Sequence, residues 1–125
     1  MLIGVPKEIK IHESRVGLTP AAVRELVANG HRVMVQKLAG AQIDLSDDKY
    51  QMAGAMMVDT PQEIYAKAEL IVKVKEPQPS EIPWLREEQM LFTYLHLAPD
   101  PLQTKGLMES GCIAIAYETV TDHFG

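Results

Sequence analysis

Short apolar runs alternate along the chain with longer stretches that place apolar residues at helical spacing. The runs are mostly aliphatic and too short for buried helices, so we predict strands buried on both faces of a sheet. They occupy residues 2–5, 33–35, 70–72, 90–95 and 112–116.

Four helix starts are indicated by a side chain that can cap the first turn, in three cases followed by a proline that lacks the N–H left free there. Glu63 completes a capping box in one of them. Gly30 and Gly111 are suited to end the first and last of these helices. The predicted starts are Thr19 before Pro20, Ser46, Thr60 before Pro61, and Asp100 before Pro101.

Strands that alternate with helices predict crossover connections and a largely parallel sheet covered on both sides. We therefore expect an α/β fold of the three-layer, doubly wound, flavodoxin or Rossmann-like type. Its five main strands would lie in the order 2-1-3-4-5. Residues 56–58 can add a short extra strand, and the proline-rich stretch 76–83 predicts a loop.

Composition narrows the functional classes. The 125 residues include 12 Lys and Arg against 17 Asp and Glu, a net charge of −5, which argues against non-specific nucleic-acid binding. Cys112 is the one cysteine and cannot form an internal disulfide. The start of the chain turns polar too soon for a signal peptide, and no apolar run has membrane length. We expect one domain over residues 1–125, cytoplasmic, without a nucleic-acid or membrane partner.

Candidate chemistry gathers where the predicted strands end. Ligands of open parallel sheets bind at the carboxyl ends of the strands, near the reversal of strand order. Arg15 lies in the loop 6–18, Lys75 follows the strand 70–72 and His96 follows the strand 90–95. An arginine can bind a carboxylate with two donors, a lysine can hold a second oxygen, and a histidine can transfer a proton near neutral pH. The three predict a site for a small 2-oxo acid.

Each candidate also has a structural interpretation. Arg15 is equally a surface ion-pair partner of a nearby glutamate. Lys73 is as good a candidate as Lys75, because strand alternation places both on the same side. His96 is equally a buried histidine bonded to a backbone carbonyl.

Other reactive residue types give weaker signals. We expect Cys112 to be a small core residue and Glu118 to be structural rather than catalytic. The histidines at 12, 31 and 123 lack ligand spacing, so no metal site is predicted. Gly-x-Gly-x-x-Gly, Walker-type and Gly-x-Ser-x-Gly motifs are missing, so no seat for a dinucleotide is recognisable.

Several long segments resemble the alanine dehydrogenase family, in its amino-terminal, substrate-binding domain, which nicotinamide nucleotide transhydrogenases share. The segments are GVPKEIK at 4–10, Glu13 with RVGLTP at 15–20, LIVKVKEP at 70–77, LFTYLHLAPD at 91–100 and AIAYETV at 114–120.

The resemblance implies an NAD-dependent enzyme that interconverts L-alanine with pyruvate and ammonia. Residue by residue, it implies that Arg15 and Lys75 bind the substrate and that His96 is the catalytic acid and base. It thereby favours Lys75 over Lys73. It also implies a homohexamer, a role in amino-acid catabolism, and NAD held by a separate Rossmann domain. That domain is expected after residue 125 and is absent from this chain, so we expect the chain alone to be inactive.

Two alternatives stay open: a truncated, non-catalytic domain that binds a small 2-oxo acid, or a transhydrogenase-like domain. The transhydrogenases resemble the chain less at 75–77 and 94–97. The segment 36–47 departs from the family, since Gln42 and Asp44 stand in place of glycines. We expect an altered path or backbone strain in that loop.

Overall fold

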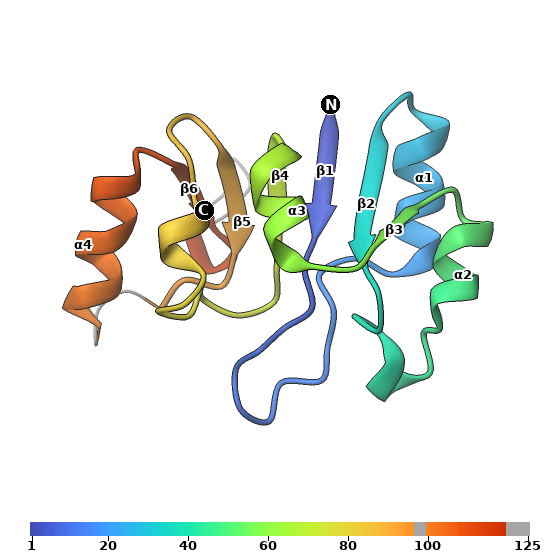
Figure 1. Ribbon diagram of the computed structural model, residues 1–125, viewed down its shortest axis with the longest axis horizontal. Helices are drawn as coiled ribbons and strands as arrows, with labels where there is room; N and C mark the ends of the chain where they lie inside the picture. The colour runs from blue at the N-terminus through green and yellow to red at the C-terminus, as the bar shows by residue number, and fades with distance from the viewer. Residues whose placement is uncertain (97–99, 120–125) are drawn as a thin grey trace.

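A computed structural model describes residues 1–96 and 100–119 of the chain. His123 and parts of the segments 91–100 and 114–120 lie outside the described residues. Six strands form one parallel sheet in the order β3-β2-β1-β4-β5-β6 (Figure 1). They are β1 (Leu2–Val5), β2 (Arg32–Gln36), β3 (Met56–Val58), β4 (Leu70–Val72), β5 (Met90–Thr93) and β6 (Ile113–Ala116).

The α/β fold class predicted from the sequence is confirmed. The five main strands keep the predicted order, as β2-β1-β4-β5-β6, and β3 adds a sixth strand outside β2. The described helices are α1 (Pro20–Ala28), α2 (Asp47–Met52), α3 (Pro61–Lys67) and α4 (Pro101–Ser110), with 3-10 turns η1 (Ala41–Ile43), η2 (Ile82–Trp84) and η3 (Tyr117–Thr119).

The predicted helix caps are present. Side-chain oxygens of Thr19, Ser46, Thr60 and Asp100 each accept a hydrogen bond from a backbone N–H of the first turn. These bonds satisfy donors that have no partner within the helix. Gly111 ends α4 in the left-handed conformation. Local sequence therefore determined where these helices begin.

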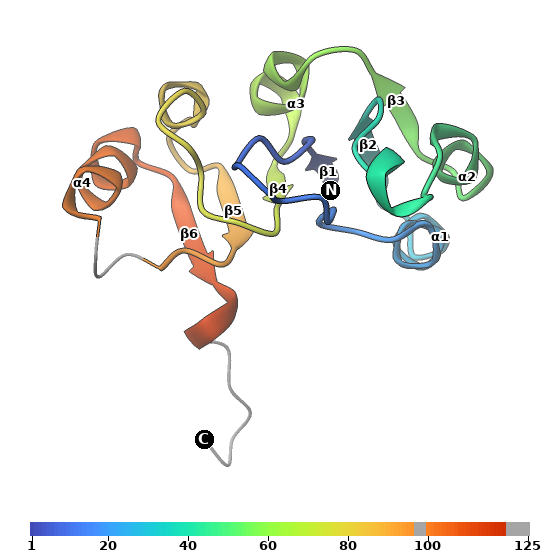
Figure 2. The same ribbon diagram turned by 90° about the horizontal axis from the view of Figure 1, so that it is seen from below.

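Two apolar cores cover the faces of the sheet. Figure 2 shows α3 and α4 on one side of the sheet and α1 on the other. Ile64 and Leu107 belong to the first core, and Val23 of α1 and Tyr50 of α2 belong to the second. Cys112 is half-buried against the first core, in agreement with its expected place.

The predicted burial of strands on both faces holds for β1 but is wrong for β6. All four residues of β1 are buried, whereas Ile113 of β6 is 52% exposed and Ile115 is 40% exposed. The reason lies in packing, because β6 is the outer strand of the sheet and β5 is its one described neighbour there.

Strand order reverses between β1 and β4. From β1 the chain continues outward to β2 and β3, and β4 then pairs with the other edge of β1. The loops that follow β1 and β4 consequently meet at one edge of the sheet, the position where open α/β sheets bind ligands. Gly17 allows this close approach, since a Cβ atom there would lie 2.5 Å from the carbonyl oxygen of Val72.

Candidate functional site

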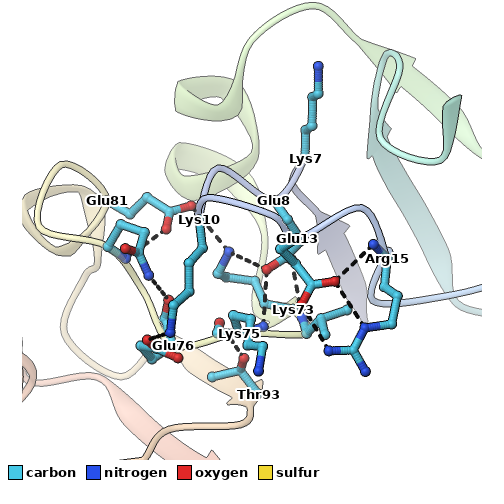
Figure 3. A network of polar contacts seen from close by, with 12 residues as sticks. Lys7, Glu8, Lys10, Glu13, Arg15, Lys73, Lys75, Glu76, Glu81 and Thr93 are labelled. Carbon is cyan, nitrogen blue, oxygen red and sulfur yellow. Dashed lines mark hydrogen bonds and ion pairs between the residues drawn. The ribbon is translucent and has the colours of Figure 1, made fainter. Parts of the chain in front are cut away.

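A buried carboxylate joins the loops that follow β1 and β4. Glu8 Oε1 accepts hydrogen bonds from Lys73 Nζ at 3.1 Å and from the Lys75 N–H at 3.0 Å, and Oε2 accepts from the Val74 N–H at 3.1 Å (Figure 3). An ion pair between Lys10 and Glu76 links the same two loops. The backbone of Lys75 is therefore held from the loop that also carries Arg15.

Lys73 is a structural residue. Its side chain is 1% exposed, and its ammonium pairs with Glu8 at 3.1 Å and with Glu81 at 3.3 Å. A buried ammonium requires such partners, because desolvation of an unpaired charge is very costly. The prediction that Lys73 and Lys75 share one side is wrong, since β4 ends at Val72 and strand alternation stops before them.

Glu81 completes the buried cluster. Its Oε2 accepts a hydrogen bond from the Tyr65 hydroxyl at 3.0 Å, and its Oε1 accepts from the Gln78 N–H at 2.8 Å. Burial, followed by the charge of Glu81, holds the pKa of Tyr65 well above its usual value. Two carboxylates and one ammonium thus form a buried cluster that is hydrogen-bonded to the loop that carries Lys75.

Arg15 pairs with Glu13 in two places. Arg15 Nε donates to Glu13 Oε2 and Nη2 donates to Oε1, both at 2.9 Å. The Arg15 side chain is 62% exposed and that of Glu13 is 5% exposed. The hydrogen bond from Arg15 is the main cause that lowers the pKa of Glu13, and the charge of Lys75 lowers it further. Arg15 is thus an ion-pair partner of a nearby glutamate, as the structural interpretation expects. The positive charge of Lys75 also acts on the Glu13 carboxylate.

Tyr94 contacts both Lys75 and His96. Lys75 Nζ lies 5.4 Å from the centroid of the Tyr94 ring, close enough for a cation–π contact. The rings of Tyr94 and His96 stack with centroids 5.6 Å apart and an interplanar angle of 18°. The buried-histidine interpretation of His96 is wrong, because this residue is exposed.

Glu118 holds the backbone at His96. Its carboxylate accepts hydrogen bonds from the N–H groups of Leu95 at 3.2 Å and His96 at 2.9 Å. His96 has a φ of 49°, a left-handed conformation that few residues other than glycine adopt without support. The bond from the His96 N–H is the main cause that lowers the pKa of Glu118. This matches the structural role expected for Glu118.

Two sets of contacts contain the three predicted site residues. Arg15 binds Glu13 in the first, and in the second Lys75 lies over Tyr94, which stacks on His96. The charge of Lys75 also helps to lower the pKa of Glu13. Chemically, the two sets supply two cations for the oxygens of a small acid and an imidazole for its proton.

Sequence reasoning missed three supporting residues: Tyr94, and Glu8 and Glu81 as anchors. Tyr94 had no signal from strand alternation, because β5 ends at Thr93 and both Tyr94 and His96 follow it. Glu8 also follows a strand at the carboxyl edge, where the same rule that selected Arg15 applied. Glu81 lies in an irregular segment, where no periodicity marks burial.

Neither of two cavities in the described residues is lined by both Arg15 and His96. A cavity of 20 Å³ lies between the Arg15 loop and the segment after β2, and Glu13, Arg15 and Gln42 are among the residues that line it. A larger one of 490 Å³ is lined by residues between Leu38 and Lys49, so it lies away from Lys75 and His96. The contacts rather than cavity size define the candidate site.

The segment after β2 shows the expected strain in part. Asp44 adopts a φ of 61°, as expected where an aspartate stands in place of a glycine. Gln42 lies in η1 and has no positive φ, whereas Leu38 has one, at 66°.

The described residues do not fit NAD. The turn after β1, where a dinucleotide-binding fold places glycines and a helix N-terminus, carries Glu8 and Glu13, and α1 begins at Pro20, which has no N–H. The Gly-x-Gly-x-x-Gly motif that lets the backbone approach a pyrophosphate is missing from this turn. No group of three or more metal-ligating side chains occurs within residues 1–96 and 100–119, and no helix among them is long and apolar enough to cross a membrane.

Comparison with known proteins assigns the chain to a family. Residues 4–125 match the family described as "Alanine dehydrogenase/PNT, N-terminal domain". The chain belongs to this family. An alanine dehydrogenase from Methanococcus maripaludis is 52% identical over 120 residues, which are 96% of this chain and 32% of that protein.

Solved structures of the alanine dehydrogenase/PNT family share the fold. An L-alanine dehydrogenase superposes with a TM-score of 0.95 at 48% identity, over 99% of this chain and 34% of that one. A transhydrogenase from Sinorhizobium meliloti superposes with a TM-score of 0.88 at 23% identity, over 97% of this chain and 37% of that one, which shows the fold alone. The resemblance seen in the sequence is confirmed, and the chain spans about a third of the length of these relatives.

Proposed function

We propose that the chain is the amino-terminal, substrate-binding domain of an alanine dehydrogenase, which converts L-alanine, NAD and water to pyruvate, ammonia and NADH. The observation that supports this is the position of Arg15, Lys75 and His96 in the loops after β1, β4 and β5, at the edge where strand order reverses, with Lys75 over Tyr94 and Tyr94 stacked on His96. Relatives about half identical over the whole chain carry the name alanine dehydrogenase.

Arg15 and Lys75 bind the substrate in this proposal. Glu13 uses two of the five N–H donors of Arg15, so the guanidinium has further donors for a substrate carboxylate. Lys75 holds the carbonyl oxygen of pyruvate as a point charge, and its backbone is fixed by Glu8 and by Thr93 Oγ1, which donates to the Lys75 carbonyl at 2.6 Å.

His96 moves the proton. During the reaction iminopyruvate is hydrated or formed, and the oxygen at the reacting carbon must lose or gain a proton. An imidazole can do both within one cycle because it titrates near neutral pH. The exposed position of His96 leaves its ring accessible to a substrate held by Lys75.

Hydride transfer requires bound NAD, and we do not assign NAD binding to the described residues. Since the turn after β1 does not fit a dinucleotide, we assign NAD to a separate Rossmann domain expected after residue 125. We further propose that the enzyme is cytoplasmic, acts in amino-acid catabolism and assembles as a homohexamer.

A histidine substitution tests the role of His96 in the complete enzyme. His96→Asn removes the proton-transfer group, while asparagine tolerates the left-handed backbone found there. We expect kcat to fall by far more than tenfold in the oxidation of L-alanine. His12→Asn is the matched control, because His12 is also exposed and has a φ of 67°. A His96→Asn enzyme within tenfold of wild type, about 1.4 kcal/mol of barrier, would contradict the assignment.

The same enzyme separates the transhydrogenase alternative, which the shared fold supports. Formation of NADH that depends on alanine supports the dehydrogenase. Hydride exchange between two nicotinamide nucleotides, without a need for alanine, would support a transhydrogenase instead. A protein with neither activity that still binds pyruvate would be the non-catalytic domain.

A further inference from the structure

Tyr94 contacts both groups that flank it at the site. Its ring lies under Lys75 Nζ at 5.4 Å and stacks on the His96 imidazole. Its hydroxyl oxygen lies 3.3 Å from His96 Nδ1, within hydrogen-bond distance. Neither substrate binding by Lys75 nor proton transfer by His96 uses this phenol.

We infer that Tyr94 is a positioning residue whose hydroxyl donates to His96 Nδ1 and thereby keeps the proton of the neutral imidazole on Nε2. The nitrogen that carries the proton in a histidine is decided by the hydrogen bond that the other nitrogen makes. A neutral imidazole offers one donor and one acceptor, so a donor at Nδ1 fixes the tautomer.

The surroundings favour the phenol as the donor. The ammonium of Lys75 over the ring draws electron density from the phenol, which makes its O–H a better donor and its oxygen a poorer acceptor. The Glu118 carboxylate binds the backbone N–H groups of Leu95 and His96. Within residues 1–96 and 100–119, the Tyr94 hydroxyl is the group that lies within hydrogen-bond distance of His96 Nδ1.

The consequence concerns the hydrogen bond that neutral His96 makes to the substrate. With the proton on Nε2, this nitrogen donates a hydrogen bond to the carbonyl oxygen of a bound 2-oxo acid. With the proton on Nδ1, Nε2 would meet that oxygen lone pair to lone pair. Tyr94 thus orients the neutral imidazole as a hydrogen-bond donor to bound pyruvate. This step rests on the proposed function, whereas the tautomer itself does not.

Nitrogen-15 NMR of histidine side chains in this chain tests the tautomer. At a pH where the imidazoles are neutral, long-range proton–nitrogen spectra show which ring nitrogen carries the proton, and His96→Asn identifies the signals of His96. We expect wild type to show Nε2–H, and Tyr94→Phe to raise the share of Nδ1–H about fivefold, the factor that one neutral hydrogen bond provides. Phenylalanine keeps the ring, so stacking and the Lys75 contact remain.

The histidines His12 and His31 give the control within the same spectra, because their tautomers should not respond to Tyr94→Phe. A wild-type His96 with its proton on Nδ1 would overturn the inference. So would an unchanged tautomer ratio in Tyr94→Phe.

Kinetic measurements on the complete enzyme distinguish the role of Tyr94 from the proposed dehydrogenase activity. We expect Tyr94→Phe to lower kcat for pyruvate reduction several-fold with little change in KM. If NMR shows the expected tautomer and the enzyme does not act on alanine or pyruvate, the proposed function fails and the proton assignment stands. If the enzyme is active and the tautomer does not respond, the role of Tyr94 fails alone.

Discussion

Lys73 and Lys75 lie two residues apart and have opposite environments. Lys73 is buried between two carboxylates, whereas Lys75 is half-buried with its ammonium over an aromatic ring. A charge that is buried with partners stabilises the fold through those partners, and a charge near solvent remains available to a ligand. These environments suit Lys73 to a structural role and leave Lys75 available for the substrate that we propose.

Methionine substitutions test these two roles. Lys73→Met leaves Glu8 and Glu81 buried without their cation, so we expect the free energy of unfolding to fall by about 3–5 kcal/mol. Lys75→Met removes a partly exposed cation and should cost at most about 1 kcal/mol. Urea denaturation of both variants, with pyruvate titrations of Lys75→Met, measures the contrast. Equal stabilities would show that charge does not hold the buried cluster.

Glu118 provides a test by pH. Hydrogen bonds from backbone N–H groups lower the pKa of Glu118 below its usual value of 4.5, so its contribution is present above that pH and is lost as the pH falls through the lowered pKa. We expect the His96 N–H proton shift to titrate with a midpoint below 4.5 in NMR spectra. The titration should vanish in Glu118→Gln and persist in Glu109→Gln, which alters a surface pair. A midpoint unaffected by Glu118→Gln would contradict the contact.

The choice between these lysines shows what sequence could tell at this scale. Their places after strands predicted Arg15, His96 and one of the two lysines, since the rule for parallel sheets needs only strand order, and the family resemblance favoured Lys75 over Lys73. Burial of Lys73 was not predictable, because it depends on Glu8, 65 residues away, and on Glu81. Tyr94 was not predictable from strand alternation either, because β5 ends before Tyr94 and His96.

At the scale of elements, close approach of two loops positions the site. The loop after β1 lies against the end of β4 where Gly17 meets Val72, and an added Cβ would come within 2.5 Å of the Val72 carbonyl oxygen. Helix starts were predictable because each cap bond lies within one turn. The contact at Gly17 was not, because it joins segments far apart along the chain.

Gly17→Ala tests whether that approach positions Arg15. The new methyl group must push the loop away from β4, so we expect pyruvate affinity to fall by about tenfold or more while the fold persists. Gly30→Ala is the control, because Gly30 has a φ of +89° but no atom lies within 4 Å of an added Cβ. It should cost stability through backbone strain and leave affinity unchanged. Isothermal titration and circular dichroism report both quantities, and equal affinities in the two variants would exclude the positioning role.

At the scale of the whole molecule, the reversal of strand order brings the loops that carry Arg15 and Lys75 to one edge, and no described residue buries the apolar side chains of β6. The apolar run of β6 looks like that of β1 in sequence, yet Ile113 and Ile115 are exposed. Exposure depends on what packs against a strand, which an apolar pattern does not encode. Fold class and strand order were therefore predictable, whereas the burial of the outermost strand was not.

Ligand selectivity of the whole chain follows from the same geometry. A ligand that binds the folded state raises its stability by RT ln(1 + [L]/Kd), about 1.4 kcal/mol at ten times Kd. We expect pyruvate to raise the Tm of the 125-residue chain by a few degrees and NAD to leave it unchanged, because Arg15 and Lys75 suit a small acid and the turn after β1 does not fit a pyrophosphate. Arg15→Met should abolish the pyruvate effect in the same thermal scans. A rise in Tm with NAD would show that these residues bind a dinucleotide, and it would contradict the proposal that NAD binds a separate domain.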